Sequence, residues 1–157
     1  MFMSVERLNR LIGEKGMNVM NGVCDKLGVP QFRRAEVAFI AEYVTVMKPL
    51  ATALDILQCK TKVYMAYLVP TVMVLKEKLQ FLLRNSSIQC CKLLVISVNA
   101  GIDKRFGQYM MNAELIASSI IHRMFKTDWI KDAELKRLGL DFLINKIQQQ
   151  QLQQVKQ

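Results

Sequence analysis

The longest regular pattern in the sequence is a double apolar stripe between Arg34 and Leu57. One stripe runs from Val37 to Leu54 at spacings of three and four residues, and a second runs from Phe39 to Leu57 at the same spacing. A helix that is apolar on more than one side is contacted from more than one side. The pattern therefore predicts a long central helix in a bundle. Pro49 lies inside this segment, and because an internal proline removes a backbone donor we expect a kink there.

Weaker versions of the same period cover most of the remaining chain and predict further helices. They extend over residues 3–12, 17–27, 62–83, 88–109 and 112–124, and a last helix follows a capping aspartate at position 132. Asn112 is expected to cap the 112–124 helix, and Gly28 to end the 17–27 helix. Pro70 predicts a kink in the 62–83 helix, or a break with a fresh start. The predicted fold is all-α, an irregular bundle of about six helices in a single domain over 1–147. The glutamine-rich tail 148–157 is expected to be a frayed helix or disordered.

Apolar residues make up 52% of the 157 residues, which excludes a disordered chain. Lys and Arg number 22 against 13 acidic residues, a formal net charge of +9. A basic balance suits an anionic partner such as nucleic acid, or serves solubility. The basic residues are spread evenly along the chain, with no dense basic arm. Charge alone leaves both readings open.

Searches for catalytic and metal-binding patterns point to no enzyme, no metal site and no cofactor. The glycine-rich phosphate loops and the serine nucleophile motif do not occur in the sequence. The cysteines at 24, 59, 90 and 91 have no zinc-ligand spacing, and we expect Cys90 and Cys91 to be reduced core residues. We also expect an intracellular chain with no signal peptide and no transmembrane segment.

Basic residues alternate with aromatic ones in two places, which is a pattern that can hold phosphates and stack on bases. The candidate DNA-contacting residues are Lys104, Arg105, Arg123 and Lys126. The competing interpretation makes the aromatic residues Phe106, Phe125 and Trp129 core anchors surrounded by solvated charges, and it is the one we favour. His122, the single histidine, is expected to serve packing or capping rather than ligand binding.

Several stretches resemble the BED-type zinc-finger proteins derived from hAT-superfamily DNA transposases. They are GVPQFRRAEVAFIAEYVTVMKPLATALDILQ at 28–58, YMAYLVPTVMVLKEKL at 64–79, GIDKRFGQYM at 101–110 and ELIASSIIHRMFKTDWIKDAEL at 114–135. The opening SVERL at 4–8 resembles a further family segment. The chain departs from the pattern at Arg123, where the family usually has proline, and at Ala66, where it usually has glycine.

The resemblance implies that the chain corresponds to the helical insertion of a ribonuclease-H-like transposase core. The BED zinc ligands are not found in the sequence, and no acidic residue matches a catalytic position of the family. The resemblance therefore implies a non-catalytic scaffold in the nucleus, with a weak and non-specific DNA-binding surface. Homo-oligomers or related transposase-derived chains are further partners that it suggests; neither a membrane nor a small-molecule substrate is expected.

Two other interpretations stay open at this point. The chain is a protein-interaction or self-association module, using the Val37–Leu54 stripe or the apolar helix 88–109 as a docking face. Alternatively it is a truncated product without an independent function.

Overall fold

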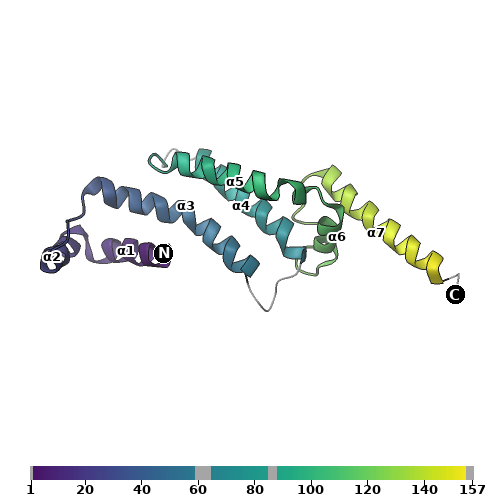
Figure 1. The fold of residues 1–157 in the computed structure, drawn as a ribbon, viewed down its shortest axis with the longest axis horizontal. Helices are drawn as coiled ribbons and strands as arrows, with labels where there is room; N and C mark the ends of the chain where they lie inside the picture. Colours follow the sequence, from purple (N-terminus) through teal and green to yellow (C-terminus); the bar gives the residue numbers. More distant parts are fainter. Residues whose placement is uncertain (1, 59–64, 85–87, 155–157) are drawn as a thin grey trace. The chain divides into compact units, whose positions relative to one another are not determined.

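The fold is all-α, as the sequence predicts. The computed structural model describes residues 2–58, 65–84 and 88–154, and within these ranges it contains seven α-helices, one short 3-10 helix and no strand. Figure 1 follows them along the chain. The helices are α1 (Phe2–Lys15), α2 (Met17–Leu27), α3 (Arg34–Gln58), η1 (Met65–Tyr67), α4 (Leu68–Arg84), α5 (Lys92–Met110), α6 (Ala113–Ile121) and α7 (Ala133–Gln154).

Contacts divide the chain into two compact units. Unit 1 comprises Met1–Thr52 and Lys78–Val98, and unit 2 comprises Ala53–Glu77 and Asn99–Gln157. Whether they fold together as the single domain predicted from the sequence stays a prediction. The tail predicted to fray begins inside α7, which continues to Gln154, and residues 155–157 lie outside the described part.

Two helices begin and one ends at capping residues that the sequence predicts. Asn112 Oδ1 accepts the backbone N–H groups of Glu114 and Leu115 at 3.0 and 3.1 Å, which caps α6. Asp132 Oδ1 accepts the N–H of Glu134 at 2.8 Å and caps α7 in the same way. Gly28 ends α2 in the left-handed conformation, with φ 65°, which glycine adopts without steric cost.

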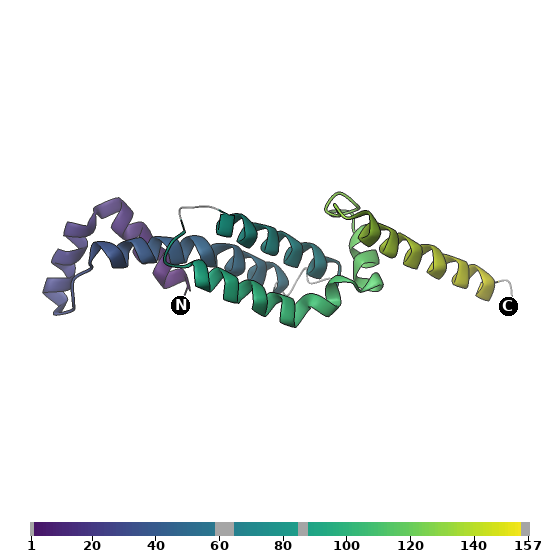
Figure 2. The same ribbon diagram turned by 90° about the horizontal axis from the view of Figure 1, so that it is seen from above.

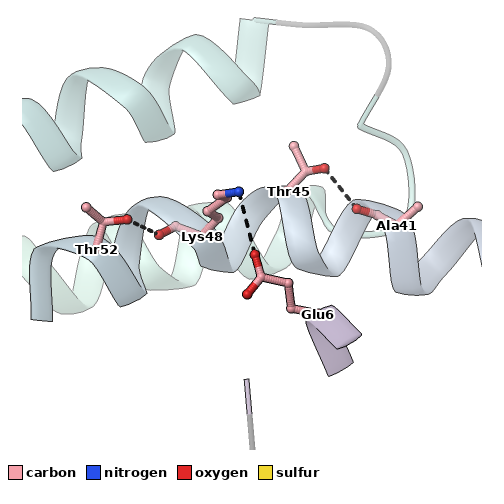
Figure 3. A network of polar contacts seen from close by, with 5 residues as sticks. All are labelled: Glu6, Ala41, Thr45, Lys48 and Thr52. Atoms are coloured by element: carbon pink, nitrogen blue, oxygen red, sulfur yellow. Dashed lines mark hydrogen bonds and ion pairs between the residues drawn. The ribbon is translucent and has the colours of Figure 1, made fainter. Parts of the chain in front are cut away.

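The two prolines occupy different places in their helices. Pro70 is the third residue of α4, in its first turn, so the helix starts afresh there and no kink is needed. Pro49 lies within α3, which continues through it, and a kink at this position stays a prediction. Thr45 and Thr52 donate their hydroxyls to the carbonyls of Ala41 and Lys48 at 2.9 Å, as Figure 3 shows. Such back-bonding often accompanies a bend.

Unit 1 carries an ion pair between α1 and α3. Lys48 Nζ lies 3.5 Å from a carboxylate oxygen of Glu6 (Figure 3). Both side chains are well exposed to solvent, so the pair adds little to stability. Asn21 links α2 to the segment before α3. Its side chain accepts the N–H of Phe32 at 2.9 Å and donates to the Phe32 carbonyl at 3.2 Å. This two-way bond fixes the chain where it enters α3.

A polar link in unit 1 joins α3 to the residues just before α5. The Glu42 carboxylate accepts three consecutive backbone N–H groups, those of Gln89, Cys90 and Cys91, at 2.8 to 3.1 Å. Cys91 directly precedes α5 and its carbonyl accepts the N–H of Val95, so its own N–H is a donor that the helix cannot satisfy itself. Gln89 and Cys90 lie in the turn before it. A negative charge at that end also interacts favourably with the helix dipole. The Glu42 carboxylate therefore holds the turn before α5 and caps that helix through the Cys91 N–H.

Unit 2 is built where α7 packs on α6. Ile116, Ile130 and Leu135 form a buried cluster, against which Met73, Ile120, Trp129 and Leu138 pack. Gly139 on α7 is the point of closest approach, because a Cβ added there would lie 2.6 Å from side-chain atoms of both Ile116 and Ile120. The fully buried Ser119 connects α6 to η1 by donating to the carbonyl of Ala66 at 2.8 Å.

The contact at Gly139 predicts opposite effects for two glycine substitutions. Gly139→Ala should lower the free energy of unfolding by roughly 1–3 kcal/mol, because the added methyl group forces α7 away from α6. Gly107→Ala on α5 has open space around it and should raise that free energy by about 0.5–1 kcal/mol. Urea unfolding followed by circular dichroism measures both. Equal stabilisation by the two alanines would contradict the close packing.

Glu42 predicts a pH-dependent contribution to the stability of unit 1. Its pKa is lowered from the ordinary value of 4.5, first by the Cys91 N–H and then by those of Gln89 and Cys90, against a smaller opposing effect of burial. A carboxyl with a lowered folded-state pKa stabilises the fold fully above the unfolded pKa and loses this effect as the pH falls through the folded pKa. Glu42→Gln should therefore lower the unfolding midpoint most near neutral pH, and progressively less as the pH falls below 4.5.

The control for this prediction is Glu14→Gln, which removes a charge from an exposed ion pair within α1. It should leave the unfolding midpoint almost unchanged at every pH. A Glu42→Gln effect that is independent of pH between neutrality and about pH 3 would show that the charge of the carboxylate is not what caps α5.

Candidate functional site

The single histidine closes α6 and organises the turn that follows. Helix α6 ends at Ile121, and His122 has extended backbone angles, φ −73° and ψ 123°. Its carbonyl accepts the N–H groups of Phe125 and Lys126 at 3.0 and 3.1 Å. Its ring nitrogen Nδ1 accepts the N–H of Met124 at 3.3 Å. His122 therefore has the capping role expected from the sequence.

Three rings pack together where this turn meets η1. The Tyr67 ring stands edge-on to Phe125, with centroids 4.9 Å apart, and to His122 at 5.1 Å. The rings of His122 and Phe125 lie 5.3 Å apart. The Tyr67 hydroxyl donates to the sulfur of Met124 at 3.2 Å. Such edge-on pairs are favoured by the charge distribution of aromatic rings, so Tyr67 stabilises the turn.

Trp129 fixes the other end of the turn. Its ring packs on the cluster of Ile116, Ile130 and Leu135, and its Nε1–H donates to the carbonyl of Lys126 at 3.1 Å. The backbone of Lys126 has a positive φ of 50°, which is uncommon for a residue other than glycine. Phe125 and Trp129 are both half-buried and make anchoring contacts, while Phe106 on α5 is also half-buried.

All four candidate DNA-contacting side chains lie in unit 2 and are exposed, on two different elements. Lys104 and Arg105 belong to α5, whereas Arg123 and Lys126 belong to the turn between α6 and α7. None of the four takes part in an ion pair within the described residues, although Asp103, next to Lys104, is paired with Lys76. Unit 2 thus carries four exposed positive charges without an acidic partner.

The Cys91 thiol is not activated as a nucleophile. Burial raises the pKa of the Cys91 thiol, and the negative charges of Glu42 and Cys90 raise it further. A helix N-terminus usually lowers a thiol pKa, but here the Glu42 carboxylate occupies that position. Cys91 is buried as expected, and Cys24 is buried as well; Cys90 is exposed, so its assignment to the core was wrong. Cys59 lies outside the described residues.

Metal binding has no support among residues 2–58, 65–84 and 88–154. No group of three or more His, Cys, Asp or Glu side chains in these ranges is placed to hold an ion. By length and composition alone, α3 is long and apolar enough to cross a membrane, a test that the core helix of a soluble protein also passes. This observation is weak evidence, and it does not change the interpretation of α3 as a bundle helix.

The two faces considered for docking differ in how much of their surface is buried. On α3 the stripe contains the buried Val44, and on α5 the stripe contains the buried Val95 and Ile102. The α5 face therefore serves internal packing, whereas on the α3 stripe Val44 is the only buried residue and Leu54 is 46% exposed. Sequence reasoning did not find Glu42 or Tyr67, whose partners lie 47 to 58 positions away and leave no local pattern.

Comparison with family models, with curated proteins and with solved structures finds no match to this chain.

The turn after α6 forms although Arg123 stands where the resembled family has proline. The residue before a proline favours extended angles, and His122 already has them. Arg123→Pro should therefore be tolerated, with an unchanged or slightly raised melting temperature, because proline restricts only the unfolded chain. Lys126→Pro is the matched control, and it should destabilise by roughly 3 kcal/mol because proline cannot adopt a positive φ and loses the N–H bonded to His122.

Differential scanning fluorimetry of the two variants, with the single tryptophan as a local probe, measures both effects. Equal destabilisation by the two prolines would show that the segment at Arg123 does not have the turn conformation described above.

Proposed function

We propose that this chain is a non-catalytic helical fragment of a hAT transposase-derived protein. It acts as a scaffold and contributes a weak, non-specific surface for DNA. The observation that carries the DNA-binding part is the set of exposed side chains Lys104, Arg105, Arg123 and Lys126, whose charges no acidic partner neutralises in the described chain. The formal net charge of +9 supports the same choice of partner.

The physical basis of the binding is the release of counterions from phosphates. Each Lys or Arg that neutralises a phosphate makes the affinity depend more steeply on salt. Four such contacts give a slope of about −3.6 in a plot of log K against log salt for duplex DNA. The aromatic residues beside Arg123 and Lys126 are engaged in packing, so base stacking does not add sequence preference. The expected binding is therefore electrostatic, and weak at physiological salt.

The scaffold part of the proposal rests on the resemblance. The stretches at 28–58 and 114–135 carry the likeness to the helical insertion of the transposase core, and no acid in the chain matches a catalytic position of that family. A scaffold role needs rigid elements, which Glu42 and the Tyr67 ring cluster supply. Nuclear localisation follows from the same likeness and is part of the proposal.

DNA binding is tested by fluorescence anisotropy with a labelled duplex at low salt, titrated with the full chain. We expect binding at micromolar protein that falls steeply as salt rises and that differs little between sequences. Replacing Lys104, Arg105, Arg123 and Lys126 together by glutamine should reduce the salt slope by about 3 to 4 units. No binding of the wild-type chain at low salt and micromolar concentration would refute the proposal.

The matched control removes the same number of positive charges from ion-paired positions. Glutamine replaces Arg10, Lys48, Lys76 and Lys131, each of which forms one of the four ion pairs of the described chain. Their carboxylate partners already offset them, so the salt slope should change by less than in the first variant. Equal losses in the two variants would mean that net charge alone, rather than the unit 2 surface, governs binding.

A further inference from the structure

Helix α7 has two apolar faces, and only one of them is covered within unit 2. Leu135 and Leu138 pack on the α6 cluster, and Gly139 touches Ile116 and Ile120. On a helix of 3.6 residues per turn, Leu140, Ile144 and Ile147 lie within about 60° of one another, on the side opposite Leu135 and Leu138. Their exposed fractions are 37%, 51% and 55%. We call these three residues the α7 stripe.

The segment that carries the α7 stripe extends beyond the packing on α6. Figure 2 shows this part of α7 continuing past α6 as a single helix. From Leu140 to Gln154 every residue is exposed except the half-buried Phe142 and Leu143. Helices of this length have marginal stability in water when nothing covers their apolar face. β-branched Ile144 and Ile147 also favour burial over solvent. We therefore expect the α7 stripe to be covered by a partner.

The charges around the α7 stripe favour a second copy of the same helix as the partner that covers it. Lys136 and Arg137 are exposed at its N-terminal end, and the uncharged Gln151 and Gln154 continue it at the C-terminal end. The last carbonyls of a helix carry a partial negative charge. In an antiparallel pair the basic residues of each copy lie beside the negative end of the other. A parallel pair would instead place Arg137 beside Arg137, which is repulsive.

We propose that two copies of this chain associate through an antiparallel pairing of their α7 stripes, related by a two-fold axis near Ile144. Such an interface is isologous, because the same patch is used by both copies. The segment from Leu140 to Gln154 spans only about 22 Å, so the contact belongs to the small class of interfaces. A dimer that forms and dissociates with concentration is expected. It does not depend on DNA, and it uses none of the four candidate DNA-contacting residues.

Sedimentation velocity of the full chain across a wide concentration range, without DNA, tests the association. The wild type should shift from the mass of one chain towards that of two. Ile144→Gln combined with Ile147→Gln should raise the dimer dissociation constant at least tenfold. Leu152→Gln is the control, because Leu152 is 64% exposed on the same helix but lies about 110° away from the stripe. Circular dichroism confirms that the variants remain folded.

Three results would overturn the association. They are a wild type that is monomeric at every concentration, a stripe variant that dimerises as well as the wild type, and an equal loss in the Leu152 variant. A DNA-binding failure with intact dimerisation would refute only the proposed function, since the two experiments share no residue.

The orientation is tested by adding negative charge to the C-terminal end of the stripe. Gln151→Glu with Gln154→Glu should tighten an antiparallel dimer several-fold at low salt, because each glutamate meets the Lys136 and Arg137 of the other copy. The control places the same two charges off the stripe, at Gln149 and Gln153, and should not tighten it. Weaker association of the stripe variant than of this control would exclude the antiparallel arrangement, because a parallel pair would bring glutamates together.

Discussion

Every helix leaves backbone donors unsatisfied at its first turn, and the way this chain meets that constraint organises unit 1. The Glu42 carboxylate on α3 accepts the N–H groups of Gln89 and Cys90, in the turn before α5, and of Cys91 at the N-terminus of that helix. A local cap would have fixed only the end of one helix. A cap supplied from a distant helix also fixes the placement of that end against α3. Burial raises the pKa of the Cys91 thiol at this helix N-terminus, and the negative charge of Glu42 raises it further.

In unit 2 the corresponding role belongs to packing around the turn that follows α6. Tyr67 reaches the turn from η1, Trp129 bonds the Lys126 carbonyl, and Ser119 bonds the carbonyl of Ala66. Together these contacts hold a backbone that includes a positive φ at Lys126. The turn forms with arginine at position 123, and His122 before it already has the extended angles that a following proline would favour. The single histidine and the single tryptophan of this segment stabilise the turn. The exposed Arg123 and Lys126 between them are accessible to solvent or to an anion.

The sequence was sufficient for features that depend on neighbours in the chain and insufficient for those that depend on distant ones. The helical period, the Asn112 and Asp132 caps and the Gly28 stop are local, and each was predicted. Glu42 stood in the pattern only as a polar position on a central helix, and nothing near it indicates α5 as its partner. Pro70 allowed either a kink or a new start, and only the position of η1 decides between them. The candidate site has the same dependence on distant residues. The sequence identified its four basic residues, but it could not predict that none of them forms an ion pair within the described residues.

The distribution of apolar surface separates the interpretations of this chain further. The α5 stripe that suggested a docking face carries the buried Val95 and Ile102, so its periodicity reflects internal packing, whereas on the α3 stripe Val44 is the only buried residue. On α7 the same period continues past the end of the α6 contact, where no element of unit 2 remains to cover Ile144 and Ile147. Periodicity alone cannot distinguish these cases, because a stripe has the same spacing whether its partner lies within the chain or outside it. For α7 the two cases are distinguished by the place where its packing partner α6 ends. Association with a second copy is therefore expected through α7, whose stripe continues past the end of the α6 contact.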